Sequence, residues 1–155
     1  MHIMTTTNTQ SINREYALLA PFFAIKLRLA LQECHQQGYL VDLFEGYRSP
    51  ERQDYLWGQG RERPGKIVTN AKAWQSWHQY GLACDIVGRI KGKWDWTIDY
   101  DKITVILLKH GFKPIEFEKP HFEITGGLTY REAKKIHDRS GLYALWAEVA
   151  KKAGN

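Results

Sequence analysis

Ten residues at positions 76–85, SWHQYGLACD, contain the most informative pattern in this chain. From Gly81 onward apolar residues alternate with small or acidic ones, which predicts a strand. Gly81, Ala83 and Asp85 would share one face of that strand because side chains alternate with period two. Two very small side chains beside a carboxylate leave open space, into which His78 can fold back from the preceding loop. An imidazole and a carboxylate that converge in this way can bind a divalent metal ion.

Residues 118–123, EKPHFE, supply a third candidate ligand. Pro120 disfavours helix in the residue before it, so this segment is expected to be extended as it enters a strand. If Phe122 points to the core, His121 and Glu123 lie on the other face. Three protein ligands would leave a fourth position for water, as in catalytic zinc sites. The predicted ligands of one zinc ion are His78, Asp85 and His121.

The remaining pattern indicates an α+β fold in which helices flank a small, largely antiparallel sheet. Helical spacing and capping residues predict helices at 11–34 (with a break near Ala20, caused by Pro21), 50–57, 101–110, 129–139 and 142–152. Strands are predicted at 40–44, 81–86, 94–98 and 121–124. We expect residues 1–10 to be a flexible tail. Residues 11–155 would form one domain, with a helical extension from about residue 128.

Composition narrows the class of protein. A chain of 155 residues with 43% hydrophobic and 13% aromatic residues fits one folded domain. The net charge of +5 favours contact with polyanions, and nucleic acid, anionic lipid and the bacterial cell wall all qualify. No basic run interleaved with aromatic residues is present, so we predict no nucleic-acid partner. Cys34 and Cys84 form no metal-binding pair or disulfide framework and are predicted to be small buried residues.

No signal peptide is evident, because no basic segment followed by an uninterrupted apolar run and a cleavage site occurs near the N-terminus. The longest apolar stretch, residues 16–25, is too short to span a bilayer. We therefore expect a protein that is made in the cytoplasm and has no membrane span. We also expect it to be a monomer.

Motifs along the chain resemble the M15 metallopeptidases. Their S-x-H-x-x-G-x-A-x-D signature is matched at positions 76–85, and residues 118–121 resemble their later acid-x-x-His motif. Residues 46–49, with Gln53, resemble an upstream arginine motif of the family. The run from 60 to 85 resembles the L-alanyl-D-glutamate peptidases, a subfamily that includes cell-wall enzymes and phage endolysins. The resemblance covers roughly residues 18–124 and implies a Hedgehog/DD-peptidase-like fold.

The resemblance also assigns chemical roles. It implies that the three predicted ligands bind zinc and that Glu118 is the general base and acid. Arg48 would hold the substrate carbonyl as it becomes an oxyanion. Members of the subfamily often have Asp where Glu118 stands, and the extra methylene changes the reach of the carboxylate. Without the resemblance, Arg48 would be read as part of a surface ion pair with Glu45 or Glu51.

Four further residues are candidates for supporting roles. Ser76, Gln53 and Trp77 are candidate substrate contacts. Ser76 could instead fix the loop before the first histidine, and Trp77 could instead belong to the core. Glu123 could orient a ligand histidine through a hydrogen bond or could simply be exposed.

The resulting functional hypothesis is a zinc peptidase that cuts the L-Ala–D-Glu bond of peptidoglycan stem peptides. We expect a phage endolysin that reaches the cell wall after the membrane is breached, with its positive charge aiding adhesion to the anionic cell envelope. The alternatives are a D,D- or L,D-carboxypeptidase on the same stem peptide, and a non-catalytic zinc-binding module of the same fold. Glu118 and Arg48 favour an enzyme, since a binding module would have little reason to keep both.

Overall fold

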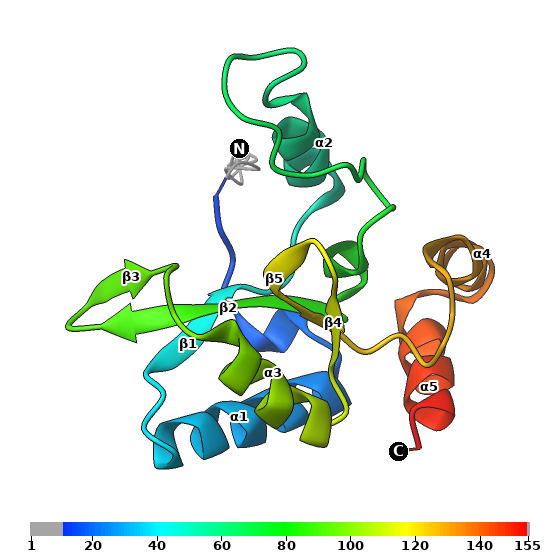
Figure 1. Cartoon of the computed structure of the whole chain (residues 1–155). Coiled ribbons are helices and arrows are strands. Elements are labelled where there is room, and N and C mark those ends of the chain that lie inside the picture. Colours follow the sequence, from blue (N-terminus) through cyan, green and yellow to red (C-terminus); the bar gives the residue numbers. More distant parts are fainter. Residues whose placement is uncertain (1–10, 155) are drawn as a thin grey trace, which may run out of the picture.

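A five-stranded antiparallel sheet lies at the centre of the computed structural model, which describes residues 11–154 (Figure 1). Its strands are β1 (Val41–Glu45), β2 (Ala83–Ile90), β3 (Lys93–Asp95), β4 (Lys113–Ile115) and β5 (Glu118–Glu123). The order is β1-β2-β5-β4, and β3 forms a hairpin with β2. The predicted α+β class with an antiparallel sheet is therefore confirmed. The predicted tail, residues 1–10, lies outside the described residues.

Helices lie on both sides of this sheet. Helices α1 (Pro21–Gln36) and α3 (Tyr100–Lys109) run along one face, and α2 (Pro50–Gly58) lies on the opposite side (Figure 1). Two short 3-10 helices, η1 (Tyr16–Leu18) and η2 (Trp77–Tyr80), precede α1 and β2. Helices α4 (Tyr130–Ser140) and α5 (Leu142–Lys152) form a C-terminal hairpin beside the sheet (Figure 1). None of the helices within residues 11–154 is long and apolar enough to cross a membrane.

Local sequence signals, such as capping residues, correctly predicted where most of the helices begin. Ser49 caps α2 by accepting a hydrogen bond from the backbone N–H of Arg52, and Thr129 forms the predicted capping box with Glu132. The prediction of a helix from Ser11 was wrong, but the predicted break near Ala20 is confirmed. The first α-helix begins at Pro21, where the missing backbone N–H costs no helical hydrogen bond.

Strand bounds were predicted less well. The strand β3 is shorter than the predicted 94–98. The strand β2 (83–90) begins and ends later than the predicted 81–86, and β5 (118–123) begins and ends earlier than the predicted 121–124. The strand β4 was missed because its three residues are too few to show an alternation. Its Pro114 is tolerated because β4 lies at the edge of the sheet and pairs only with β5 in the described chain.

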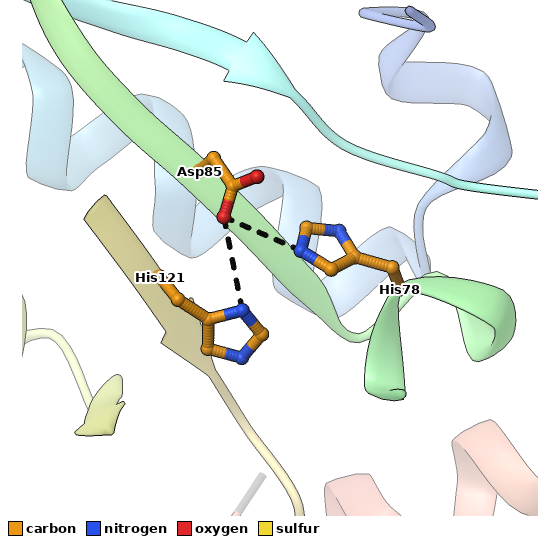
Figure 2. A group of neighbouring side chains, drawn as sticks. All are labelled: His78, Asp85 and His121. Atoms are coloured by element: carbon orange, nitrogen blue, oxygen red, sulfur yellow. Dashed lines mark ion pairs between the residues drawn. The ribbon is translucent and has the colours of Figure 1, made fainter. Parts of the chain in front are cut away.

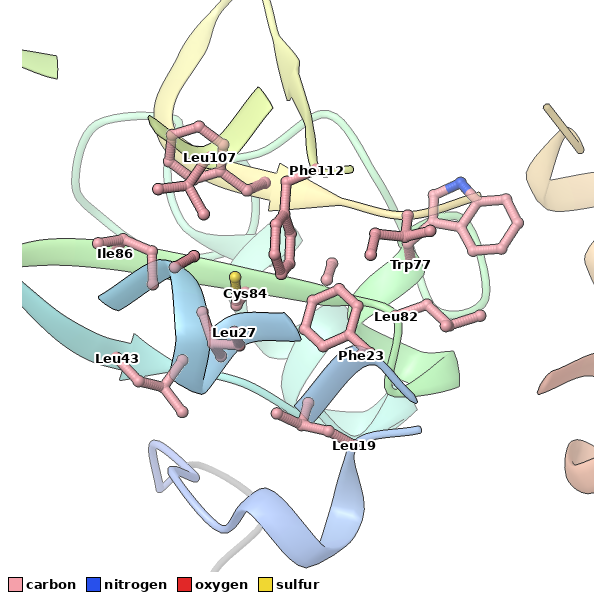
Figure 3. Packing of buried hydrophobic residues seen from close by; sticks show 14 of the residues in the cluster. Leu19, Phe23, Leu27, Leu43, Trp77, Leu82, Cys84, Ile86, Leu107 and Phe112 are labelled. Carbon is pink, nitrogen blue, oxygen red and sulfur yellow. The ribbon is translucent and has the colours of Figure 1, made fainter. Parts of the chain in front are cut away.

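The main core lies between the sheet and the pair α1 and α3. Phe23 of α1 and Leu107 of α3 pack with Cys84 of β2, and all three are fully buried (Figure 3). Cys34 is buried in the same core, so both cysteines act as the predicted small apolar residues, and neither forms a disulfide within the described chain. Because Cys84 points into this core, its neighbour Asp85 points to the opposite face of the sheet.

Gly81 connects η2 to β2 in a conformation that requires glycine. Its φ is 67°, in the left-handed region, and a Cβ at this position would lie 2.6 Å from the carbonyl oxygen of Leu18. The carbonyl of Gly81 accepts a hydrogen bond of 2.9 Å from the backbone N–H of Ala20. The turn therefore lies directly against the segment that leads into α1.

Replacing Gly81 by alanine should lower the free energy of unfolding by about 2 kcal/mol or more. The left-handed conformation alone costs a non-glycine residue about 1–2 kcal/mol, and the clash with the Leu18 carbonyl adds to this. Urea unfolding of the two proteins measures the difference. Gly127→Ala is the matched control, because Gly127 has a φ of 81° but nothing within 4 Å of the added Cβ. Equal losses in the two variants would contradict the expected clash.

Candidate metal centre

Three adjacent strands bring ionisable side chains to one face of the sheet. Asp85 of β2 pairs with Glu45 of β1 on one side and with His121 of β5 on the other. Directly paired residues of antiparallel strands point to the same face, so these three side chains form a row. This row lies on one face of the sheet, and the core with α1 and α3 lies on the other face. Its position follows from the register of three strands far apart in sequence.

His78 reaches this row from η2. Its Nε2 lies 3.3 Å from Asp85 Oδ1, and the Nδ1 of His121 lies 3.7 Å from the same oxygen (Figure 2). One potential ligand atom from each of the three residues lies within 4.8 Å of the others. The structure thus brings together the three residues that the sequence suggested as metal ligands.

Both imidazoles are oriented through the ring nitrogen that faces away from Asp85. The Nδ1 of His78 lies 2.7 Å from the carbonyl oxygen of Gly46. The Nε2 of His121 lies 2.7 Å from Oε1 of Glu123. Since both partners are acceptors, these nitrogens act as the donors. The other nitrogen of each neutral ring then presents its lone pair towards Asp85, as a metal ligand must.

The two nitrogens that face Asp85 fit a bound cation. The Nε2 of His78 and the Nδ1 of His121 are buried, and neither has a hydrogen-bond partner within residues 11–154. Buried polar atoms rarely lack partners, so two such nitrogens beside a carboxylate are suited to bind a cation. Two nitrogens and one oxygen form a donor set that suits zinc.

Electrostatics supports the same arrangement. Burial, followed by the nearby Arg48 charge, lowers the pKa of His78, which favours the neutral ring. Burial also acts to lower the pKa of His121, but Glu123 and Asp85 outweigh it and raise that pKa. Burial acts to raise the pKa of Asp85, yet His78 and Arg48 hold it well below its ordinary value. Asp85 is therefore ionised, and a metal ion at this site would compete with a proton on His121.

Arg48 holds the oxygen of Asp85 that faces away from the histidines. Its Nη2 donates to Asp85 Oδ2 at 3.2 Å and to Glu45 Oε1 at 2.7 Å, and its Nη1 donates to Gln53 Oε1 at 3.0 Å. Glu45 also accepts a hydrogen bond of 2.5 Å from Nε of Arg52. Burial acts to raise the pKa of Glu45, but the two arginines hold it below its ordinary value.

Buried Glu45 and the backbone carbonyl of Gly46 are parts of the site that the sequence did not reveal. The sequence suggested Glu45 only as a partner in a surface ion pair, yet it is 2% exposed and Arg48 is 9% exposed. Gly46 acts through its backbone carbonyl, which no side-chain pattern can indicate. The available signal was the position of Glu45 at the end of a strand, immediately before the arginine motif.

The candidate substrate residues lie at different depths. Ser76 caps η2, and its hydroxyl accepts a hydrogen bond of 3.4 Å from the backbone N–H of His78. Trp77 is largely buried and packs in the core. Gln53 is fully buried, and it links Arg48 to the carbonyl of Ala71. Gln53 can therefore act on a ligand only through the groups that it holds.

Glu118 borders two pockets beside the candidate metal centre. Its side chain is 45% exposed, and its Oε2 is 3.9 Å from Nδ1 of His121. A cleft of about 410 Å³ extends from Glu118, Arg48 and Asp85 to an apolar wall, and a smaller pocket of about 90 Å³ includes His121. The apolar wall contains Phe44, Trp96 and Phe117, and the smaller pocket includes Ser76 and Trp77. A cleft of this size can hold a small ligand or part of a peptide.

Comparison with known proteins places the chain in a family. Residues 18–125 match the model of the VanY family, described as D-alanyl-D-alanine carboxypeptidase. This chain belongs to the VanY family. Membership confirms the relationship that the sequence motifs indicated. The matched segment contains the three candidate ligands, Arg48 and Glu118, whereas α4 and α5 lie beyond it.

This VanY-family chain also resembles a characterised relative. The peptidoglycan L-alanyl-D-glutamate endopeptidase CwlK of Bacillus subtilis (strain 168) is 44% identical to it over 66 residues. The similar region covers 42% of this chain and 40% of CwlK. The chain therefore matches less than half the length of this relative.

Replacing Glu45 by alanine should lower the free energy of unfolding by about 3–5 kcal/mol, because it leaves two buried arginines without their shared carboxylate. Urea unfolding gives the value. Glu51→Ala is the control: Glu51 is exposed in the first turn of α2, and its loss should cost at most about 1 kcal/mol. A loss below about 1 kcal/mol for Glu45→Ala would show that this buried pairing contributes little.

Proposed function

We propose that this protein is a zinc-dependent peptidase that hydrolyses peptidoglycan stem peptides at the L-Ala–D-Glu bond. The observation that carries the proposal is the pair of buried imidazole nitrogens, without hydrogen-bond partners in the described chain, that face Asp85 at the edge of a cleft. Membership of the VanY family supports a peptidase that acts on cell-wall peptides. The similarity to CwlK supports the choice of bond.

A second candidate is a carboxypeptidase that removes the terminal D-alanine of the same stem peptide. The description of the VanY family favours it, whereas the 44% identity to CwlK favours the endopeptidase. A non-catalytic zinc-binding module fits less well, because Glu118 and Arg48 both line the cleft next to the candidate ligands. We include the role of a phage endolysin in the proposal, and the net charge of +5 would aid its adhesion to an anionic envelope.

Glu118 is the proposed general base and acid. When bound, zinc lowers the pKa of a water molecule from about 15.7 to about 7 and polarises a carbonyl oxygen. The Glu118 carboxylate borders both the cleft and the smaller pocket, and it lies close to His121 without being a candidate ligand. From this position it would accept a proton from water and pass it to the leaving amine.

Arg48 is proposed to stabilise the negative charge that develops on the substrate carbonyl. It borders both pockets, and its guanidinium is held in place by Asp85, Glu45 and Gln53. The same contacts mean that Arg48 also orients Asp85. A fixed donor of this kind is effective because it needs no reorganisation during the reaction.

Digestion of a defined disaccharide-pentapeptide that ends in D-Ala–D-Ala, followed by mass spectrometry, tests the function. Zinc-loaded protein should release a fragment with a new amino terminus on D-Glu, and a chelator should stop the reaction until zinc is restored. Release of D-alanine alone would establish the carboxypeptidase instead. If neither product forms, either from this substrate or from purified cell wall, the proposed function is wrong.

The Glu118→Gln variant should keep one zinc ion per chain and lose about 10²–10⁴-fold in turnover, the usual contribution of a general base. Metal analysis and the rate of stem-peptide cleavage provide the two measurements. Glu116→Gln is the matched control, because Glu116 is exposed two residues earlier and lines neither pocket. Near-normal turnover in Glu118→Gln would assign the base to another residue.

A further inference from the structure

The C-terminal hairpin packs against the turn that carries His78. Trp146 of α5 donates its Nε1–H to the carbonyl oxygen of Tyr80, at 2.6 Å. Tyr80 is fully buried and is the last residue of η2, two positions after His78. The ring of His137, from α4, lies 5.8 Å from the Tyr80 ring and 5.0 Å from the Trp74 ring. Both helices of the hairpin therefore contact η2 or the loop before it.

The loop before η2 has an unusual backbone at Trp74. Its φ is 66°, a left-handed value that a bulky residue rarely adopts. Local contacts hold it there: its N–H donates to Oε1 of Gln79, and its carbonyl accepts a hydrogen bond from the hydroxyl of Tyr80. The ammonium group of Lys134, from α4, lies 5.2 Å from the centre of the Trp74 ring. The hairpin thus adds contacts to a strained segment beside the site.

The hairpin itself is firmly attached to the domain. Leu145 and Val149 of α5 are fully buried in the hydrophobic core cluster. A Cβ on Gly126 would lie 3.1 Å from the carbonyl oxygen of Val149, which shows a close backbone approach. At the other end of η2, the backbone of Gly81 lies close to the carbonyl oxygen of Leu18. The turn that carries His78 is therefore enclosed between the start of the domain and its end.

We propose that α4 and α5 position the metal centre, with Trp146 fixing the turn that aims His78 at Asp85. Ligand distances in metal sites must hold to within about 0.2 Å, so a small shift of η2 would weaken binding. This inference rests on the proposed zinc binding. It assigns a role to helices that lie beyond the segment matched to the VanY family model.

The Trp146→Phe variant tests this role, because it keeps an aromatic ring but removes the N–H that holds the Tyr80 carbonyl. Zinc affinity, measured by competition with a chelating dye, should fall by roughly tenfold, as when supporting partners of metal ligands are removed. Val149→Ala is the control: it removes buried volume from the same helix but keeps the hydrogen bond from Trp146 to the Tyr80 carbonyl. The zinc affinity of Val149→Ala should stay within about twofold of that of the original protein. This should hold even if urea unfolding shows that Val149→Ala loses as much stability as Trp146→Phe, or more.

Equal weakening of zinc binding in both variants, or no weakening in Trp146→Phe, would overturn the proposal. Hydrogen exchange of the metal-free proteins supplies an independent measurement. The backbone amides of His78, Gly81 and Leu82 should exchange faster in Trp146→Phe than in Val149→Ala. If the original protein binds no zinc, the proposed function fails. The hydrogen-exchange comparison of the two metal-free variants then decides by itself whether the hairpin fixes the turn. Equal exchange in the two variants would then overturn the positioning role.

Discussion

The site depends on one ionised carboxylate, that of Asp85, held in a mostly buried position. Burying an isolated charge costs several kcal/mol, so the surrounding residues must compensate it. Oδ2 of Asp85 accepts a hydrogen bond from Arg48, while Oδ1 faces the imidazoles of His78 and His121. The two oxygens therefore have separate partners: one is held by a permanent cation, and the other is available to a metal ion.

The position of this carboxylate follows from the alternation of side chains along β2. One side of the strand contributes Cys84 to the core over α1 and α3, and the other side presents Asp85 in register with its neighbours on β1 and β5. Arg48, in turn, is held by Glu45, which it shares with Arg52. A change of one residue in strand register would place the carboxylate in the apolar core. The strand register that packs the core therefore also brings the site residues together.

The backbone contributes as much to the site as the side chains do. The carbonyl of Gly46 orients the ring of His78, and the N-terminal cap at Ser76 shapes the turn from which that ring projects. The carbonyl of Tyr80 receives the indole N–H of Trp146 from the C-terminal hairpin. The position of the candidate ligand His78 is therefore linked to Trp146, which lies in the last helix of the chain's described part.

Local sequence signals were enough for the α+β class, most helix bounds and the three candidate ligands. Caps, glycines and alternation act over a few residues, and the spacing of His78, Asp85 and His121 carries a recognisable family motif. The strand β4, the buried pairing of Glu45 and the contact of Trp146 with Tyr80 emerged only in the folded chain. Each of these depends on strand register or on packing between distant segments. Such contacts form only when the whole core assembles, and no local pattern encodes them.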